Sequence, residues 1–181
     1  LGIIIGVAAV ITMVAVGAGA QARVEDQIKS LGSNLIIILS GNFTSGGVRM
    51  GSGSQLTITE DDAYALQREV EGVQAAAPML RGSGQVVFGN NNWSTQIYGV
   101  TPEYLEARQW DVTSGRAFDP SHVEGAAKVV LLGQTVARTL FGDSDPVGET
   151  LRVRRVPHTV IGVLDRKGQS MVGQDQDDVV L

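Results

Sequence analysis

The stretch that decides the fold is the N-terminal run LGIIIGVAAVITMVAVGAGAQA, residues 1–22. It contains no charged residue, and its only polar side chains are those of Thr12 and Gln21. About twenty helical residues rise roughly 30 Å, which is the thickness of the hydrocarbon core of a bilayer. A helix on the surface of a soluble protein would carry a polar stripe, whereas this run is apolar on every helical face. The run therefore predicts a transmembrane helix over residues 1–22.

A cleavable signal peptide is the alternative interpretation of this run. Ala18-Gly19-Ala20 fits the small-residue pattern of a cleavage site. The apolar run is longer than the roughly 7–15 residues usual for the core of a signal peptide, which favours a retained helix. Because the chain begins at Leu1, inside the apolar run, we expect it to be a segment of a longer protein. Under the alternative, the remainder would be a secreted or membrane-anchored binding module with no transport role.

Small residues gather on one face of the predicted membrane helix. Gly2, Gly6, Ala9 and Met13 lie at helical spacing, and Val16 and Ala20 continue the same face. Small side chains allow the backbone of a second helix to approach closely within a membrane. We therefore expect this face to pack against another transmembrane helix.

The helix is expected to continue beyond the membrane to about residue 31. Val24, Ile28 and Leu31 extend an i, i+4, i+7 apolar stripe, and four charged side chains fill the other face. Gly32 then gives a helix end. Since no Gly or Pro interrupts the chain from residue 21 to 31, this segment is predicted to be a stiff coupling helix between the membrane and the domain that follows.

Composition narrows the chemistry of that domain. The formal net charge is -5, which argues against nucleic acid as a partner, because phosphate binding needs a basic surface. The chain contains no cysteine, which excludes disulfides, thiolate catalysis and cysteine-ligated metals.

Hydrophobic periodicity and turn residues predict a mixed α+β domain over residues 33–181. Gly- and Ser-rich residues 40–54 predict a loop. A helix is expected to begin after the cap residue Thr59, to place Leu66 and Val70 in the core, and to end at Gly72. Further helices are expected after Thr101 and over 134–141, and strands over 34–39, up to 88, 93–99, 128–132, 149–154, 158–164 and 179–181.

No catalytic, cofactor or metal site emerges from the motifs. Residues 40–54 lack the order of a phosphate-binding loop, and no serine sits in a nucleophile-elbow motif. His122, placed in a polar loop, and His158, at a strand start, have no metal-ligand spacing. We therefore predict a non-catalytic segment that binds no cofactor.

Two side-chain groups leave a choice between structure and ligand binding. Asp175, Asp177 and Asp178 could collect a calcium ion, but they lack the order of an EF-hand, which favours a solvated acidic loop. Five aromatic residues could line an apolar cleft, although packing in the core is favoured. These five are Trp93, Tyr98, Tyr104, Trp110 and Phe118.

One series of short motifs is more specific. GQTVA at residues 133–137 leads to Leu140-Phe141-Gly142, then to DPVG at 145–148, to VIGVL at 160–164 and to Lys167-Gly168. This order resembles the periplasmic core domain of MacB-type ABC transporter permeases, within the FtsX-like permease superfamily. Residues 1–8 and 30–34 resemble the first transmembrane helix of that family and its exit, so the resemblance covers essentially the whole chain.

The residues that carry the resemblance have structural rather than catalytic roles. Gly148 follows a turn and feeds a strand, where a positive φ is expected. Gly162 lies inside an apolar strand, which suggests a bulge or a close backbone approach. The motif residues that we expect to matter structurally are Gly133, Leu140, Phe141, Gly142, Asp145, Pro146, Gly148 and Gly162.

The resemblance implies the wider organisation of the protein. Family members pair with a cytoplasmic ATPase domain or subunit, work as dimers of permeases in the inner membrane, and export or release a substrate on its outer side. Their core domain lies in the periplasm or outside the cell and is divided into an α/β subdomain and a strand-rich subdomain. A periplasmic adaptor protein and membrane lipid are the further partners that the family implies.

Overall fold

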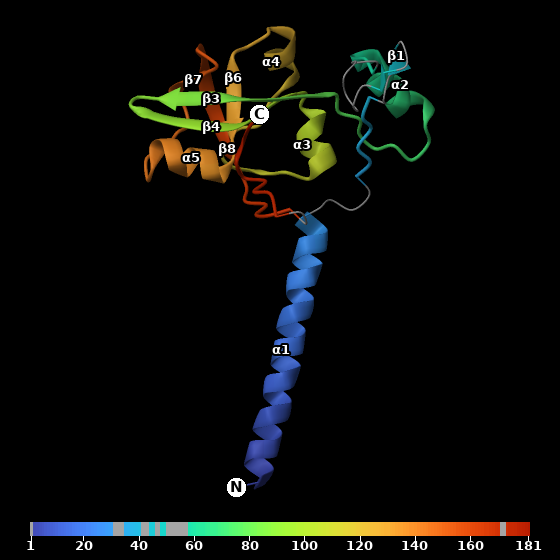
Figure 1. The fold of residues 1–181 in the computed structure, drawn as a ribbon, viewed down its shortest axis with the longest axis vertical. Helices are drawn as coiled ribbons and strands as arrows, with labels where there is room; N and C mark the ends of the chain where they lie inside the picture. Colours follow the sequence, from blue (N-terminus) through green and yellow to red (C-terminus); the bar gives the residue numbers. More distant parts are fainter. Residues whose placement is uncertain (1, 31–34, 41–43, 46–47, 50–57, 171–172) are drawn as a thin grey trace. The chain divides into compact units, whose positions relative to one another are not determined.

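The computed structural model describes residues 2–30, 35–40, 44–45, 48–49, 58–170 and 173–181. Contacts within the chain group it into two units, Leu1–Leu35 and Ile36–Leu181. Figure 1 shows the long helix of the first unit and the mixed helices and strands of the second. The chain has the mixed α+β fold that the sequence predicts.

Helix α1 (Gly2–Ser30) is uninterrupted over 29 residues. The four residues of the expected packing face, Gly2, Gly6, Ala9 and Met13, are all exposed on it. Val24 and Ile28 of the expected coupling helix belong to α1, and Leu31 lies outside the described residues. In the part of the chain that the structure describes, no helix combines the length and the apolarity of a membrane span.

The strand predicted over residues 34–39 is wrong for the residues that the structure describes. Residues 35–40 form neither strand nor helix, and Ile36 is 82% exposed and Leu39 63% exposed. An apolar run becomes a buried strand only where neighbouring strands pair with it, and no described strand does so. Within the predicted loop over 40–54, β1 (Thr44–Ser45) and β2 (Val48–Arg49) pair antiparallel, and most of the remaining positions lie outside the described residues.

Helix α2 (Glu60–Glu69) begins at the predicted cap. The Thr59 hydroxyl accepts from the Asp62 backbone N–H (3.4 Å), and the Asp62 carboxylate accepts from the Thr59 backbone N–H (2.8 Å). This reciprocal pair satisfies two of the free donors at the helix start. The helix ends at Glu69 rather than at Gly72, and Val70, expected in the core, is 46% exposed. None of the residues of α2 itself is buried either, so the helix does not pack into a core of the described residues.

Seven strands form the main sheet, in the order β5-β8-β6-β9-β4-β3-β7. Figure 1 labels five of them: β3, β4, β6, β7 and β8. Because β7 also pairs with β8, six of the seven strands close into a ring. Strand β5 is the seventh and pairs with β8 at residues 162–164, beyond the stretch 156–159 that pairs with β7. The strands are β3 (Met79–Phe88), β4 (Asn91–Val100), β5 (Val112–Gly115), β6 (Val129–Leu132), β7 (Thr150–Val153), β8 (Val156–Leu164) and β9 (Val179–Val180).

Two buried clusters lie on opposite faces of this sheet. Helix α5 (Gln134–Phe141) contributes to the first, which includes Val130 and Leu132 of β6. Helix α3 (Glu103–Arg108) contributes to the second, which includes Leu131 of the same strand. Alternate residues of a strand point to opposite faces, so an uninterrupted apolar strand requires cover on both sides. The two helices supply that cover.

Sequence patterns locate these elements well, with two omissions. Helix α5 has the predicted bounds, and β6, the β3–β4 hairpin, the β7–β8 hairpin and β9 lie within a few residues of prediction. Strand β5 and helix α4 (Pro120–Glu124) were not predicted. His122, assigned to a polar loop, instead belongs to α4, where its ring Nδ1 accepts from the Asp119 backbone N–H (3.1 Å) and completes a capping box.

A bulge and a close backbone approach both occur at Gly162. In the β6–β8 ladder, Val130 pairs with Val160 and Leu131 pairs with Gly162, so Ile161 has no partner. A Cβ atom on Gly162 would lie 2.8 Å from the carbonyl oxygen of Ser114 and 2.9 Å from that of Arg116. Strand β5 can therefore approach β8 only if position 162 carries no side chain.

We predict that Gly162→Ala lowers the free energy of unfolding by about 1–3 kcal/mol, because the added methyl group forces β5 away from β8. Chemical denaturation monitored by circular dichroism measures the loss. Gly99→Ala is the matched control, since its added Cβ would have its nearest neighbour at 3.8 Å. Equal stability of the two variants would show that the close approach is unimportant.

Candidate functional site

The motif residues converge on α5 and its two ends. A Cβ atom on Gly133 would lie 2.2 Å from the carbonyl oxygen of Asp177, so only glycine fits before the helix. Leu140 and Phe141 are buried, and the Phe141 ring lies 4.0 Å from that of Phe88, centroid to centroid. Gly142 ends the helix with a φ of 61°. Each residue therefore shapes or packs α5.

The turn after α5 uses the second motif. The Asp145 carboxylate accepts from the Val147 backbone N–H (3.0 Å), and Pro146 lies between them. Gly148 has a φ of 90°, as expected for its position, and its N–H donates to the Val160 carbonyl (2.8 Å). This turn delivers the chain to β7 beside β8.

The loop between β8 and β9 is held by a buried carboxylate. Asp177 is only 2% exposed, and its two oxygens accept from the backbone N–H groups of Lys167 (2.8 Å) and Gly168 (3.0 Å). The Arg166 guanidinium lies 3.8 Å away. A buried carboxylate needs such donors, because an unpaired buried charge is very costly.

The expectation of a solvated acidic loop is wrong for Asp177, which is buried, whereas Asp175 is exposed as expected and Asp178 is half-buried. Asp175 accepts from the Thr135 hydroxyl (2.6 Å), and Asp178 accepts from the Trp93 indole N–H (2.8 Å) and the Thr95 hydroxyl (2.7 Å). These carboxylates accept from protein donors rather than facing a common cation. Among the residues that the structure describes, no three metal-ligating side chains form a group that could hold a metal ion.

Lys167 fastens the same loop to α3. Its amino group donates to the Arg108 carbonyl (2.9 Å) and lies 5.8 Å from the centre of the Trp110 ring. Burial lowers the pKa of Lys167, and the nearby Arg108 charge acts in the same direction, while three carboxylates oppose the shift. The Arg108 guanidinium also donates to Gln176 (3.0 Å). The loop is thus attached at both of its ends.

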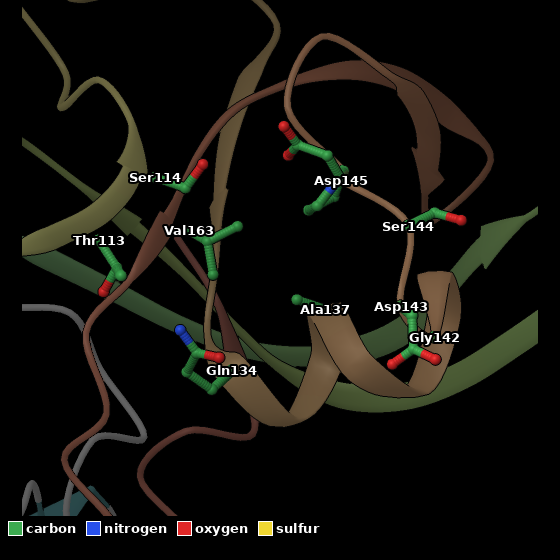
Figure 2. A pocket seen from close by; sticks show the side chains of 10 residues that line it. Thr113, Ser114, Gln134, Ala137, Gly142, Asp143, Ser144, Asp145 and Val163 are labelled. Carbon is green, nitrogen blue, oxygen red and sulfur yellow. The ribbon is translucent and has the colours of Figure 1, made fainter.

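A small open cavity of about 280 Å³ lies beside α5. Figure 2 shows Thr113 and Ser114 of β5 on one side of it, and Asp143, Ser144 and Asp145 of the loop after α5 on the other. The lining also contains Gln134, whose amide is fixed by a hydrogen bond to the Leu164 carbonyl (3.0 Å). Neither histidine lines the cavity, so its hydroxyl groups have no imidazole base beside them.

The aromatic residues divide as the packing interpretation predicts, except for one. Tyr104 and Trp110 are buried in the second cluster, and Tyr98 and Phe118 pack against it. Trp93 is 37% exposed and binds Asp178 instead. The five rings therefore line no common cleft.

This geometry defines the class of protein. It is an α+β domain in which the motif residues stabilise turns, the ends of a helix and a loop. The sequence profile of the MacB-like periplasmic core domain matches residues 1–181, so the chain belongs to that family.

Relatives in the family are much longer than this chain. It is 44% identical over 182 residues to the macrolide export ATP-binding/permease protein MacB of Syntrophobacter fumaroxidans, and 42% identical over 181 residues to that of Bdellovibrio bacteriovorus. All of this chain is covered in both comparisons, but only 26% and 28% of those relatives. The chain thus spans about a quarter of their length.

Solved structures agree on the fold. The periplasmic region of MacB from Actinobacillus actinomycetemcomitans superposes with a TM-score of 0.67 at 24% identity, over 84% of this chain and 66% of that one. The extracellular domain of the ABC-type transporter YknZ from Gram-positive bacteria gives 0.56 at 25% identity, over 60% of this chain and 58% of that one.

We predict that Asp177→Asn lowers the free energy of unfolding by about 1–3 kcal/mol, because two half-buried backbone donors lose a carboxylate acceptor. The change is measured as the urea midpoint, and hydrogen exchange at the Lys167 and Gly168 amides should accelerate. Asp143→Asn, in the exposed loop after α5, is the control. A midpoint equal to that of the control would contradict the role assigned to Asp177.

Proposed function

We propose that this chain is a segment of an ABC transporter permease that couples cytoplasmic ATP hydrolysis to the export or release of a substrate on the outer side of the inner membrane. The observation that carries the proposal is the family match over residues 1–181. Relatives that are more than 40% identical are named as macrolide export ATP-binding/permease proteins, which supports an export role. The division of residues 33–181 into an α/β and a strand-rich subdomain stays a prediction.

In this proposal, the segment transmits movement and does not react with substrate. The motif residues act on turns and packing, and the ATPase belongs to another domain or subunit of the transporter. A second permease chain, a periplasmic adaptor protein and membrane lipid are the proposed partners. The exposed face of Gly2, Gly6, Ala9 and Met13 would pack against another transmembrane helix.

The proposal assigns residues 1–22 to the first transmembrane helix. Twenty-two residues without a charge support this assignment, as do large apolar side chains exposed along α1 such as Ile5, Val10 and Val14. Exposed aliphatic surface on all sides of a helix is unfavourable in water and favourable in lipid.

Residues 23–31 would form a lever between the membrane and the outer domain. Helix α1 runs from Gly2 to Ser30 without a break, which supports a stiff lever over residues 23–30. A continuous helix transmits tilt and rotation, whereas a flexible joint absorbs them. Val24, Ile28 and Leu31 would form the apolar stripe of this coupling helix, of which Leu31 lies outside the described residues.

We expect residues 1–181, expressed with their native upstream sequence, to stay in the membrane fraction through carbonate extraction, because a transmembrane helix resists this treatment. Residues 23–181 are the matched control and should be released. Recovery of a soluble product beginning near residue 21 would support the signal-peptide alternative instead.

In the full transporter, Ile28→Pro should leave ATP hydrolysis intact while transport falls sharply. Proline in a helix interior removes one backbone donor and clashes with the preceding turn, at a cost of about 3 kcal/mol or more. Ile28→Ala keeps the helix and serves as the control, with both variants compared at matched expression. Normal transport by a folded, ATP-hydrolysing proline variant would contradict the lever and favour a passive docking role for the outer domain.

A further inference from the structure

One edge of the main sheet is open over the first half of β3. Strand β3 pairs with β4 along its whole length, from Met79 to Phe88, but it pairs with β7 only at Val86 and Val87. No described strand pairs with the outer side of β3 between Met79 and Gln85. The hairpin of β3 and β4 is visible in Figure 1.

The direction of the free backbone groups follows from the contacts of Arg154, in the turn between β7 and β8. Its backbone N–H donates to the Gln85 carbonyl (3.1 Å), and its guanidinium donates to the Ser83 carbonyl (3.2 Å from Nε). Alternate residues of a strand direct their backbone groups to opposite sides. Arg81 and Met79 therefore present their N–H and C=O groups to the same outer edge.

The charge along this edge is positive. Strands β3 and β4 contain no Asp or Glu, and their one charged residue is Arg81. Arg154 and Arg155 add two exposed cations at the adjoining turn. The ion pairs found among the described residues are His122–Asp119 and Arg166–Asp177, so none of these three arginines is neutralised there. The rest of the chain is acidic, with a net charge of -5.

The side-chain surface beside the edge can receive another strand. Leu80 is 64% exposed, and the next two residues on its face are Gly82 and Gly84. The Arg154 side chain lies against both glycines, since a Cβ on Gly84 would meet it at 2.8 Å. A strand added here could contact the apolar side chain of Leu80, the flat surface over the two glycines and the guanidinium of Arg154.

We propose that the edge of β3 docks an acidic, extended segment of a partner protein by strand addition, through the backbone groups of Met79 and Arg81 and the N–H of Ser83, whose carbonyl is held by Arg154. Backbone hydrogen bonds give such docking its affinity, and neighbouring side chains give it its specificity. A second copy of this chain does not fit, because edge-to-edge pairing would bring the arginines of both copies together, and like charges across a strand pair are destabilising. The proposal does not depend on the transport function.

Fluorescence anisotropy with the full-length protein in detergent tests this docking. The probe is a short fluorescein-labelled peptide of alternating glutamate and valine, which should bind saturably. Ser83→Pro should weaken binding about tenfold, because it removes one outward N–H that β4 does not use. Arg155→Glu should weaken binding by at least as much, whereas Arg138→Glu, the same charge change on an exposed residue of α5, should not.

A peptide N-methylated at alternate residues keeps the charge of the probe but cannot pair with a strand edge, so it should not bind. This peptide keeps the test decisive if the Ser83→Pro protein fails to fold. Equal binding of both peptides would overturn the proposal by showing a purely electrostatic contact. Absence of binding by the unmodified probe would overturn it as well, and would favour an edge already covered within the full-length protein.

Discussion

The contact between Gly133 and the β8–β9 loop is the constraint on which the rest of the sheet depends. The Gly133 N–H donates to the Val179 carbonyl (2.9 Å), and the Thr135 N–H donates to the Asp177 carbonyl (3.2 Å). Because a side chain at position 133 would collide with Asp177, the loop can pass over the start of α5 only at a glycine. This passage lets β9 enter between β6 and β4, which completes the ring of paired strands.

A carboxylate and two glycines lie at the joints of the sheet, meaning the places where segments distant in sequence come close together. Each joint brings backbone groups close together, and buried backbone donors must find acceptors. Asp177 supplies acceptors for Lys167 and Gly168, and Gly162 gives β5 room to approach β8. In the linear sequence these positions resemble a ligand-binding or catalytic motif, since they combine acidic residues with glycines. In three dimensions they are parts of the scaffold.

The sequence predicted elements whose signals are local. Helix α5 and the glycine at its end follow from periodicity and capping within ten residues. Both hairpins follow from apolar runs that flank short turns. Prediction from the sequence failed where the burial or pairing of a segment depends on residues that are distant along the chain. Residues 35–39 have the composition of a buried strand, but no described strand pairs with them. Asp175, Asp177 and Asp178 have the composition of a solvated loop but accept hydrogen bonds from β4, α5 and their own loop. No pattern within either segment identifies those partners.

A domain that transmits movement under the proposed function must resist deformation between its points of attachment. The ring of strands, the buried Asp177 and the Lys167 contact to α3 all join segments that are distant in sequence, so an applied displacement is shared across the sheet. Packed interiors transmit strain because they are dense and have low compressibility. The edge of β3 differs, because no described strand pairs with its outer side from Met79 to Gln85, and the proposed docking there would break none of these joints. Under the two proposals, a rigid interior with a receptive edge at β3 suits a part that is moved by one partner and acts on another.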